Sequence, residues 1–205
     1  EMASLGAKVM QPASIQEARL NRIEIDVRST FSKTAGTMIT KKKNIFSNNT
    51  IRGISFTKND AKLTLIGVKD KPGIAASIFK PLYENSINVD MVVQNVSAGG
   101  KETDLTFTIK LEDLKKTEKL VKNNKYIKYR KLIINKNVSK VSIVGVGMIT
   151  TPGITYRMFK ALAKKKINIE VISTSEIKIS VLINKKNLKK SVEILHQEFK
   201  LNNSL

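Results

Sequence analysis

The residues with the clearest chemical potential lie around two Pro-Gly pairs, Pro72-Gly73 and Pro152-Gly153. Each pair follows an apolar stretch and precedes an apolar pattern with helical spacing, so each is expected to open a helix, whose first turn tolerates proline. A helix N-terminus presents free amide N–H groups and a partial positive charge, which suit a carboxylate. Asp70, just before the first pair, could accept hydrogen bonds from an ammonium group. Together these groups could bind the zwitterion of an amino acid.

Further polar residues follow each turn. In the first copy, Asn88 and Asp90 begin the next expected strand, and Gln94 is expected to point to a similar face. The corresponding region of the second copy offers Ile154, Thr155, Asn168, Ser175 and Glu176. Pro-Gly turns often serve structure alone, so the interpretation rests on the constellation occurring twice. Thr150 stands where the first copy has Asp70, which suggests that the second turn contributes to an interface instead of holding its own ligand.

The two turns belong to an internal repeat with an offset of about 80 residues. Pro72-Gly73-Ile74 falls on Pro152-Gly153-Ile154. Three further matches follow the turns: Phe79 on Phe159, Leu82 on Leu162, and Ile87-Asn88 on Ile167-Asn168. Such agreement in spacing and residue type indicates two copies of one structural unit.

Periodicity predicts the elements of each unit. In the first copy we expect strands at 62–68, 88–96, 105–111 and 129–134, a helix after Pro72-Gly73, and a second helix from Asp113 to about Lys122. In the second copy we expect strands at 142–147, 168–173 and 177–183, a helix at 154–165, and a helix that begins at Asn187 or Ser191 and ends near Phe199. The first order is β-α-β-β-α-β, the ferredoxin-like arrangement of an α+β fold.

The second copy lacks its fourth strand, and an unpaired sheet edge is a liability. The strand-like segment at 51–57 has no place in the first copy. We therefore expect it to complete the second unit, which nests the first unit within the second.

Pro81 interrupts the helix pattern of the first copy, where the second copy has Ala161. A proline inside a helix removes a hydrogen bond and costs roughly 3 kcal/mol. We expect a kink between Ser77 and Pro81, or a helix that stops early.

Composition limits the function classes. The chain has 205 residues, no Cys and no apolar run of membrane-spanning length, which fits one large or two small domains in a reducing compartment. The formal net charge is +20, from 31 Lys, 6 Arg and 17 acidic residues. A basic ferredoxin-like protein that binds nucleic acid is one alternative. Arginine is scarce and only 5% of residues are aromatic, which argues against it.

An independent enzyme is a second alternative. His196 is the only histidine and is expected to lie on a helix. No Ser-His-acid arrangement or metal-ligand spacing accompanies it, so no catalytic or metal-binding residue is assigned.

Several stretches resemble the tandem ACT domains of aspartate kinase. GVKDKPGIAASIF, NVDMVVQNVS and DLTFTIKLEDL resemble its first ACT domain, and SIVGVGMITTPGITYRMFKAL and NIEVISTSEIKISVLI its second. EMASLGAKVMQPASIQEA is similar to the end of the amino-acid kinase catalytic domain in that family. The implied organisation is the end of the α/β catalytic domain at 1–40, the first ACT unit at 58–137, and the second at 50–57 and 138–205.

The resemblance implies the regulatory part of a cytoplasmic enzyme that phosphorylates L-aspartate with ATP to give 4-phospho-L-aspartate. L-lysine, L-threonine or both would bind between ACT units and inhibit it. The implied partners are a second copy and the catalytic domain, and neither a membrane nor nucleic acid is expected. ATP and magnesium are implied for the full enzyme, with no cofactor in this chain. The implied effector positions are Asp70, Lys71, Pro72, Gly73, Ile74, Ala75, Asn88, Val89, Asp90, Gln94, Ile154, Thr155, Asn168, Ile169, Ser175 and Glu176. A dimerising ACT module without a ligand is a third alternative.

Overall fold

The computed structural model describes residues 2–7, 10–40, 50–96, 99–146, 148 and 151–201. Its centre is one antiparallel sheet with the strand order β4-β5-β3-β6-β8-β7. The strands are β3 (Gly53–Lys69), β4 (Val89–Val96), β5 (Glu102–Lys110), β6 (Lys131–Val144), β7 (Ile169–Thr174) and β8 (Lys178–Asn184). The helices that pack on them are α2 (Ile74–Glu84), α3 (Leu114–Lys122), α4 (Ile154–Lys164) and α5 (Leu188–Glu198). Short 3₁₀ turns, η1 (Leu111–Asp113) and η2 (Lys185–Asn187), precede α3 and α5.

The strand pairing contains two ferredoxin-like units that share the central strands β3 and β6. The first half of β3 pairs with the end of β6, with Gly53 opposite Val144 and Thr57 opposite Lys140. The second half of β3 pairs with β5 and with the beginning of β6. The segment at 51–57 therefore completes the second unit through its residues from Gly53 onward, and the predicted nesting of the first unit in the second is confirmed.

The prediction of separate strands at 51–57 and 62–68 was wrong, because β3 runs through both. The polar residues at 58–60 interrupt the apolar pattern without ending the strand. The register with β6 shifts on either side of Asp60, which is buried and bonded by Thr57 and Lys110. β6 likewise joins the strands expected at 129–134 and 142–147.

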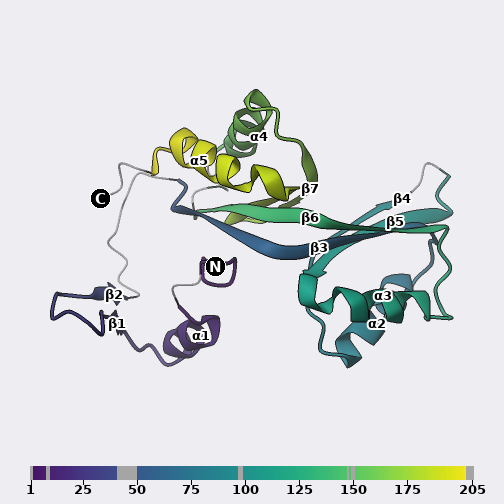
Figure 1. Ribbon diagram of the computed structural model, residues 1–205, viewed down its shortest axis with the longest axis horizontal. Helices are drawn as coiled ribbons and strands as arrows, with labels where there is room; N and C mark the ends of the chain where they lie inside the picture. The colour runs from purple at the N-terminus through teal and green to yellow at the C-terminus, as the bar shows by residue number, and fades with distance from the viewer. Residues whose placement is uncertain are drawn as a thin grey trace.

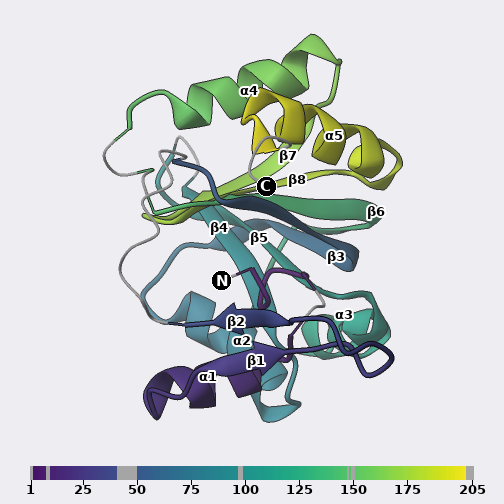
Figure 2. The same cartoon turned by 90° about the vertical axis from the view of Figure 1, so that its left-hand side faces the viewer.

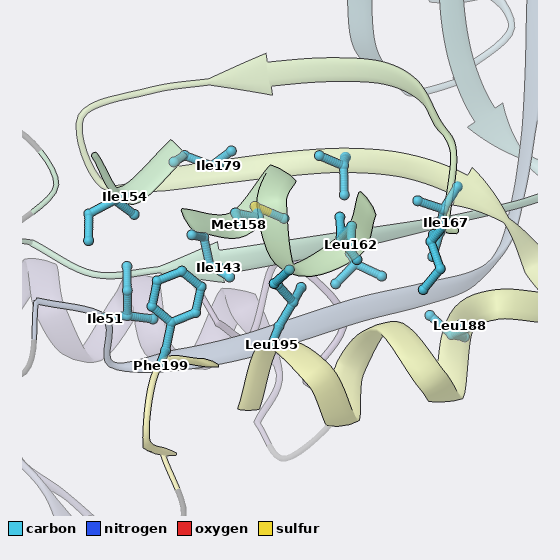
Figure 3. Packing of buried hydrophobic residues seen from close by; sticks show 14 residues of the cluster. Ile51, Ile143, Ile154, Met158, Leu162, Ile167, Ile179, Leu188, Leu195 and Phe199 are labelled. Atoms are coloured by element: carbon cyan, nitrogen blue, oxygen red, sulfur yellow. The ribbon is translucent and has the colours of Figure 1, made fainter. Parts of the chain in front are cut away.

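The helices of the two units cover opposite faces of the sheet (Figures 1 and 2). α2 and α3 lie below β3 in Figure 1. Ile78 and Leu82 of α2 and Val121 of α3 form one core with Leu63, Leu65 and Phe107 of the strands. Above β3, α4 and α5 enclose the second core. Figure 3 shows that core, in which Met158, Leu162, Leu195 and Phe199 meet Ile143 and Ile179 of the strands. Each unit therefore has a hydrophobic core of its own.

The repeat is also visible in how the first helix of each unit ends. Ser86 and Lys166, one offset apart, both adopt the left-handed conformation, with φ of 57° and 56°. Ile87 N donates to Leu82 O at 2.9 Å, and Ile167 N donates to Leu162 O at 3.1 Å. These bonds form the Schellman arrangement that stops a helix.

The helix α2 continues through Pro81 to Glu84, so the alternative in which it stops early was wrong. Proline has no N–H to donate to the carbonyl of Ser77. The side-chain amide of Asn124 donates to that carbonyl instead, at 2.9 Å. A residue 47 positions away thus replaces the lost backbone bond.

The other helices begin close to their predicted positions. Asp113 directly precedes α3, but its side chain makes no capping bond, and its own carbonyl accepts from Thr117. α5 begins after Asn187, the first of the two predicted starts, and Ser191 lies buried within it.

Residues before the sheet form α1 (Pro12–Leu20) and a small hairpin of β1 (Ile25–Val27) and β2 (Thr37–Ile39). The helix α1 buries no side chain. The turn at 2–7 packs on the sheet: Leu5 is buried, and its carbonyl accepts from Ser55 Oγ at 2.6 Å. Among the described residues, no helix combines the length and apolar character needed to cross a bilayer.

Candidate functional site

The first Pro-Gly turn lines a hollow of about 400 Å³ at the N-terminus of α2. Its lining brings together seven of the predicted residues: Asp70, Lys71, Pro72, Gly73, Ile74, Ala75 and Gln94. The turn and strand β4 therefore come together as the sequence predicted.

Gly73 is the residue that turns the chain into α2. Its φ of 85° lies in the left-handed region, which glycine adopts without the strain of a side chain. No side chain caps the helix. The amide of Ile74 donates to Lys71 O at 3.1 Å, so the following amides of the first turn remain for a bound anion. The helix dipole adds a partial positive charge at this end.

Asp70 supplies the negative charge of the hollow. Its amide donates to Lys101 O at 3.0 Å, which fixes the backbone at the end of β3. Within the described part of the chain, its carboxylate has no hydrogen bond or ion pair, and its residue is only partly exposed. The carboxylate can therefore accept from an ammonium group. Gln94, exposed on β4, adds an amide that can both donate and accept.

The second Pro-Gly turn lines a hollow of about 260 Å³ at the N-terminus of α4. Gly153 repeats the conformation of Gly73, with φ of 91°. The hollow contains four predicted residues, Ile154, Thr155, Ser175 and Glu176, together with Thr151 and Thr174. Thr150, the counterpart of Asp70, lies outside the described residues.

Thr174 was not among the predicted residues, although the 80-residue offset of the repeat indicates it. Thr174 lies 80 positions after Gln94, and each lines the hollow of its own unit. Thr151 was also missed; its hydroxyl lies 3.3 Å from that of Thr50, so it belongs to the contact between the turn and the segment before β3.

Five predicted residues lie outside both hollows: Asn88, Val89, Asp90, Asn168 and Ile169. They lie just before or at the start of the edge strands β4 and β7. Asp90 precedes Gln94 by four residues, or about 13 Å of extended strand. Both strand starts lie where the two units of the chain meet, since Met91 and Val171 pack in one cluster with Val138 and Leu182.

At this junction the carboxylate of Asp90 pairs with Lys140 of β6, whose side chain is 7% exposed. Burial raises the pKa of Asp90, but the hydrogen bond and charge of Lys140 outweigh it, and the pKa lies below its ordinary value. Glu170, which lies 80 residues after Asp90, makes the reverse connection, from the second unit to the first. It pairs with Lys62 of β3 at 2.5 Å and accepts from Asn135 at 3.2 Å. The single sequence gave no signal for these partners, which come from distant strands.

Among the described residues, no group of three or more His, Cys, Asp or Glu side chains gathers closely enough to hold a metal ion. The two hollows offer amide groups, hydroxyls and single carboxylates. This chemistry suits a small polar ligand with a carboxylate and an ammonium group.

Known proteins of similar sequence and structure identify the family of this chain. The family model described as "ACT domain" matches residues 63–124 and 141–199. An aspartate kinase of Pseudomonas fluorescens is 43% identical over 203 residues, which are 98% of this chain and 49% of that protein. The regulatory subunit of aspartate kinase from Thermus thermophilus, solved without ligand, is 36% identical with a TM-score of 0.68. The match covers 73% of this chain and 99% of that subunit.

This chain belongs to the aspartate kinase family. It spans about half the length of the Pseudomonas relative and contains the ACT region. The fold likeness extends beyond the ACT units. Aspartokinase III of E. coli, solved in complex with lysine and aspartate, has a TM-score of 0.73 over 97% of this chain and 44% of its own, at 23% identity.

Proposed function

We propose that this chain is the amino-acid sensor of an aspartate kinase. L-threonine, L-lysine or both bind at the Pro-Gly hollows and inhibit the ATP-dependent phosphorylation of L-aspartate to 4-phospho-L-aspartate by the whole enzyme. ATP and magnesium serve that reaction in the catalytic part. No step of it is assigned to the residues described above.

The observation that carries the proposal is the pairing of opposite charges in the first hollow. Helix-terminal amides that suit a carboxylate lie beside the carboxylate of Asp70, which suits an ammonium group. A free amino acid carries both groups on a single carbon, its Cα. The membership in the aspartate kinase family supports L-threonine or L-lysine as the ligand, since these are the effectors that the family resemblance implies.

The lining of the first hollow supports threonine. Asp70 is its only acidic residue among the described ones, and Gln94 can bond a hydroxyl. The ammonium of a lysine side chain needs a second acid. Asp90 is already paired with Lys140, and Glu176 lines the other hollow. Lysine in the first hollow would therefore take its second acid from another copy of the chain.

Inhibition requires that the ligand prefer one arrangement of the enzyme, since a ligand shifts an equilibrium only by its difference in affinity. Such coupling is typically about 1–3 kcal/mol, or about 5–150-fold. We propose that two copies pair through their ACT units and that the ligand selects between arrangements of this pair.

Calorimetric titration of the chain with threonine, lysine and other amino acids tests the proposal. We expect saturable binding of threonine or lysine, and a loss of about tenfold or more in affinity for Asp70→Asn, since a charge-assisted hydrogen bond contributes about 1.5–3 kcal/mol. The control Glu112→Gln removes one exposed carboxylate of the same unit and should bind like the unchanged chain. Absence of binding to either amino acid, or equal binding by Asp70→Asn, would contradict the proposal.

A further inference from the structure

A groove of about 880 Å³ lies between α2 and α3 of the first unit, apart from both Pro-Gly hollows. Its lining includes the lysines Lys80, Lys116, Lys119 and Lys125, with Tyr126 beside them. Glu84 is the one acidic residue among the described lining residues. We call this surface the α2–α3 groove.

The groove has a fixed frame. The Asn124 side chain donates to Ser77 O at 2.9 Å and accepts from Tyr126 N at 3.0 Å. It thereby ties the loop after α3 to α2. Tyr126 is 84% exposed although its backbone is held by this bond. Pro81 and Leu120 add apolar surface to the lining.

The second unit shows how the same space is closed. Arg157 of α4, 80 residues after Ser77, contacts the end of α5. Its guanidinium donates to a Glu198 carboxylate oxygen at 2.9 Å and to the Glu198 carbonyl at 2.7 Å, and it covers the Phe199 ring at 4.9 Å. In the first unit the short Ser77 leaves this space open.

The lysines of the groove are largely uncompensated. Lys119 and Lys125 make no ion pair within the described part of the chain. Lys116 Nζ donates to a neutral group, the Asn85 carbonyl, at 3.3 Å. Lys80 is 3.8 Å from Glu84, with side chains 73% and 55% exposed, a geometry in which an ion pair contributes little. The groove therefore carries a surplus of positive charge beside apolar surface.

We propose that the α2–α3 groove binds an acidic, partly apolar segment of a protein partner. Four lysines complement carboxylates, which increases the association rate and the specificity of binding. The apolar stems of the lysines, with Pro81, Leu120 and Tyr126, can cover apolar side chains of the same segment. Nucleic acid fits less well, because the described residues of the lining include no arginine for bidentate phosphate contacts.

Fluorescence anisotropy of a short labelled peptide, in which glutamate and leucine alternate, tests this inference on the full chain. We expect saturable binding that weakens as salt increases. The charge reversal Lys119→Glu with Lys125→Glu should weaken it by about tenfold or more. Tyr126→Ala, which changes no charge, should weaken it by about threefold.

The matched control reverses Lys164 and Lys186 of the second unit, which are also exposed and carry the same charge. It should change the affinity by less than about twofold, because it alters only the overall charge. Equal weakening by both pairs of reversals, no binding at all, or tighter binding of a single-stranded RNA oligonucleotide at the groove would overturn the proposal. Each of these outcomes is independent of whether the Pro-Gly hollows bind an amino acid.

Discussion

At the scale of single residues, the two acidic side chains at the strand starts differ from Asp70. Asp70 faces a hollow and has no partner among the described residues, whereas Asp90 and Glu170 are bound to lysines of the other unit. Carboxylates around the two Pro-Gly turns and at the strand starts thus have two different environments. The free one is suited to a ligand, and the paired ones hold the two units together.

Asp90 gives the chain a pH-dependent contribution to stability. Because its pKa is lower in the folded chain than its ordinary value of 3.8, the contribution is complete above that value and is lost as the pH falls through the lower, folded pKa. Asp90→Asn should lower the free energy of unfolding by about 1 kcal/mol at pH 7, a small value because water screens the half-exposed carboxylate. The difference should shrink at pH 3. Urea unfolding at both pH values measures it.

The control for this experiment is Glu84→Gln, in an exposed pair of α2. It should leave the free energy of unfolding nearly unchanged at both pH values. A loss for Asp90→Asn that is the same at pH 7 and pH 3 would show that the ion pair with Lys140 is not its cause.

At the scale of elements, α2 and the loop after α3 depend on each other. The Asn124 amide bonds the Ser77 carbonyl that Pro81 leaves without a backbone donor. Asn124→Ala should therefore destabilise the chain by about 1 kcal/mol. In a Pro81→Ala background the cost should fall by at least half, because an alanine N–H can donate to Ser77 O.

A double-mutant cycle by urea unfolding measures this coupling. Asn124→Ala also removes the hydrogen bond between Asn124 and Tyr126. Because this loss occurs in both backgrounds, it cancels in the coupling energy of the cycle. Asn123→Ala, in the same loop, is the control and should show no coupling to Pro81. Equal costs of Asn124→Ala in both backgrounds would mean that the amide does not replace the helix bond.

The sequence predicted the elements and their order because apolar periodicity and Pro-Gly turns are local signals. It also predicted the nesting, since the missing strand left only one candidate segment. It could not predict that β3 continues past residues 58–60, because the burial of Asp60 depends on Lys110 of a neighbouring strand. It left open whether α2 continues or stops at Pro81, because the bond from Asn124 that replaces the lost one comes from a distant position. Both facts are tertiary contacts between distant positions.

The same limit applies to the candidate site. The residues that follow one another in the turn, 70–75, line one hollow as predicted. Gln94 joins them because β4 returns beside the helix start. Asn88 and Asn168 are close in sequence to residues that line the hollows. However, they lie next to the first residues of β4 and β7, at the strand ends that point away from the hollows. Sequence proximity therefore predicted the turn correctly, whereas strand direction decided which polar residues reach it.

At the scale of the whole molecule, the chain is one sheet with two ligand-sized hollows and a junction between them. The central strands β3 and β6 belong to both units, and two ion pairs cross the junction. The two units are therefore joined by continuous strands and by side-chain contacts. The basic α2–α3 groove lies outside this arrangement and offers a separate surface to a partner.

The most direct test of the central claim is to follow backbone amide signals of the chain by NMR during titration with threonine and with lysine. We expect saturable shifts at Gly73, Ile74, Ala75 and Gln94 with at least one of the two amino acids, and an apparent affinity equal to the calorimetric value. Shifts confined to the strand starts near Asn88 and Asn168, or no saturable shift with either amino acid, would contradict the assignment of the first Pro-Gly hollow as the sensor site.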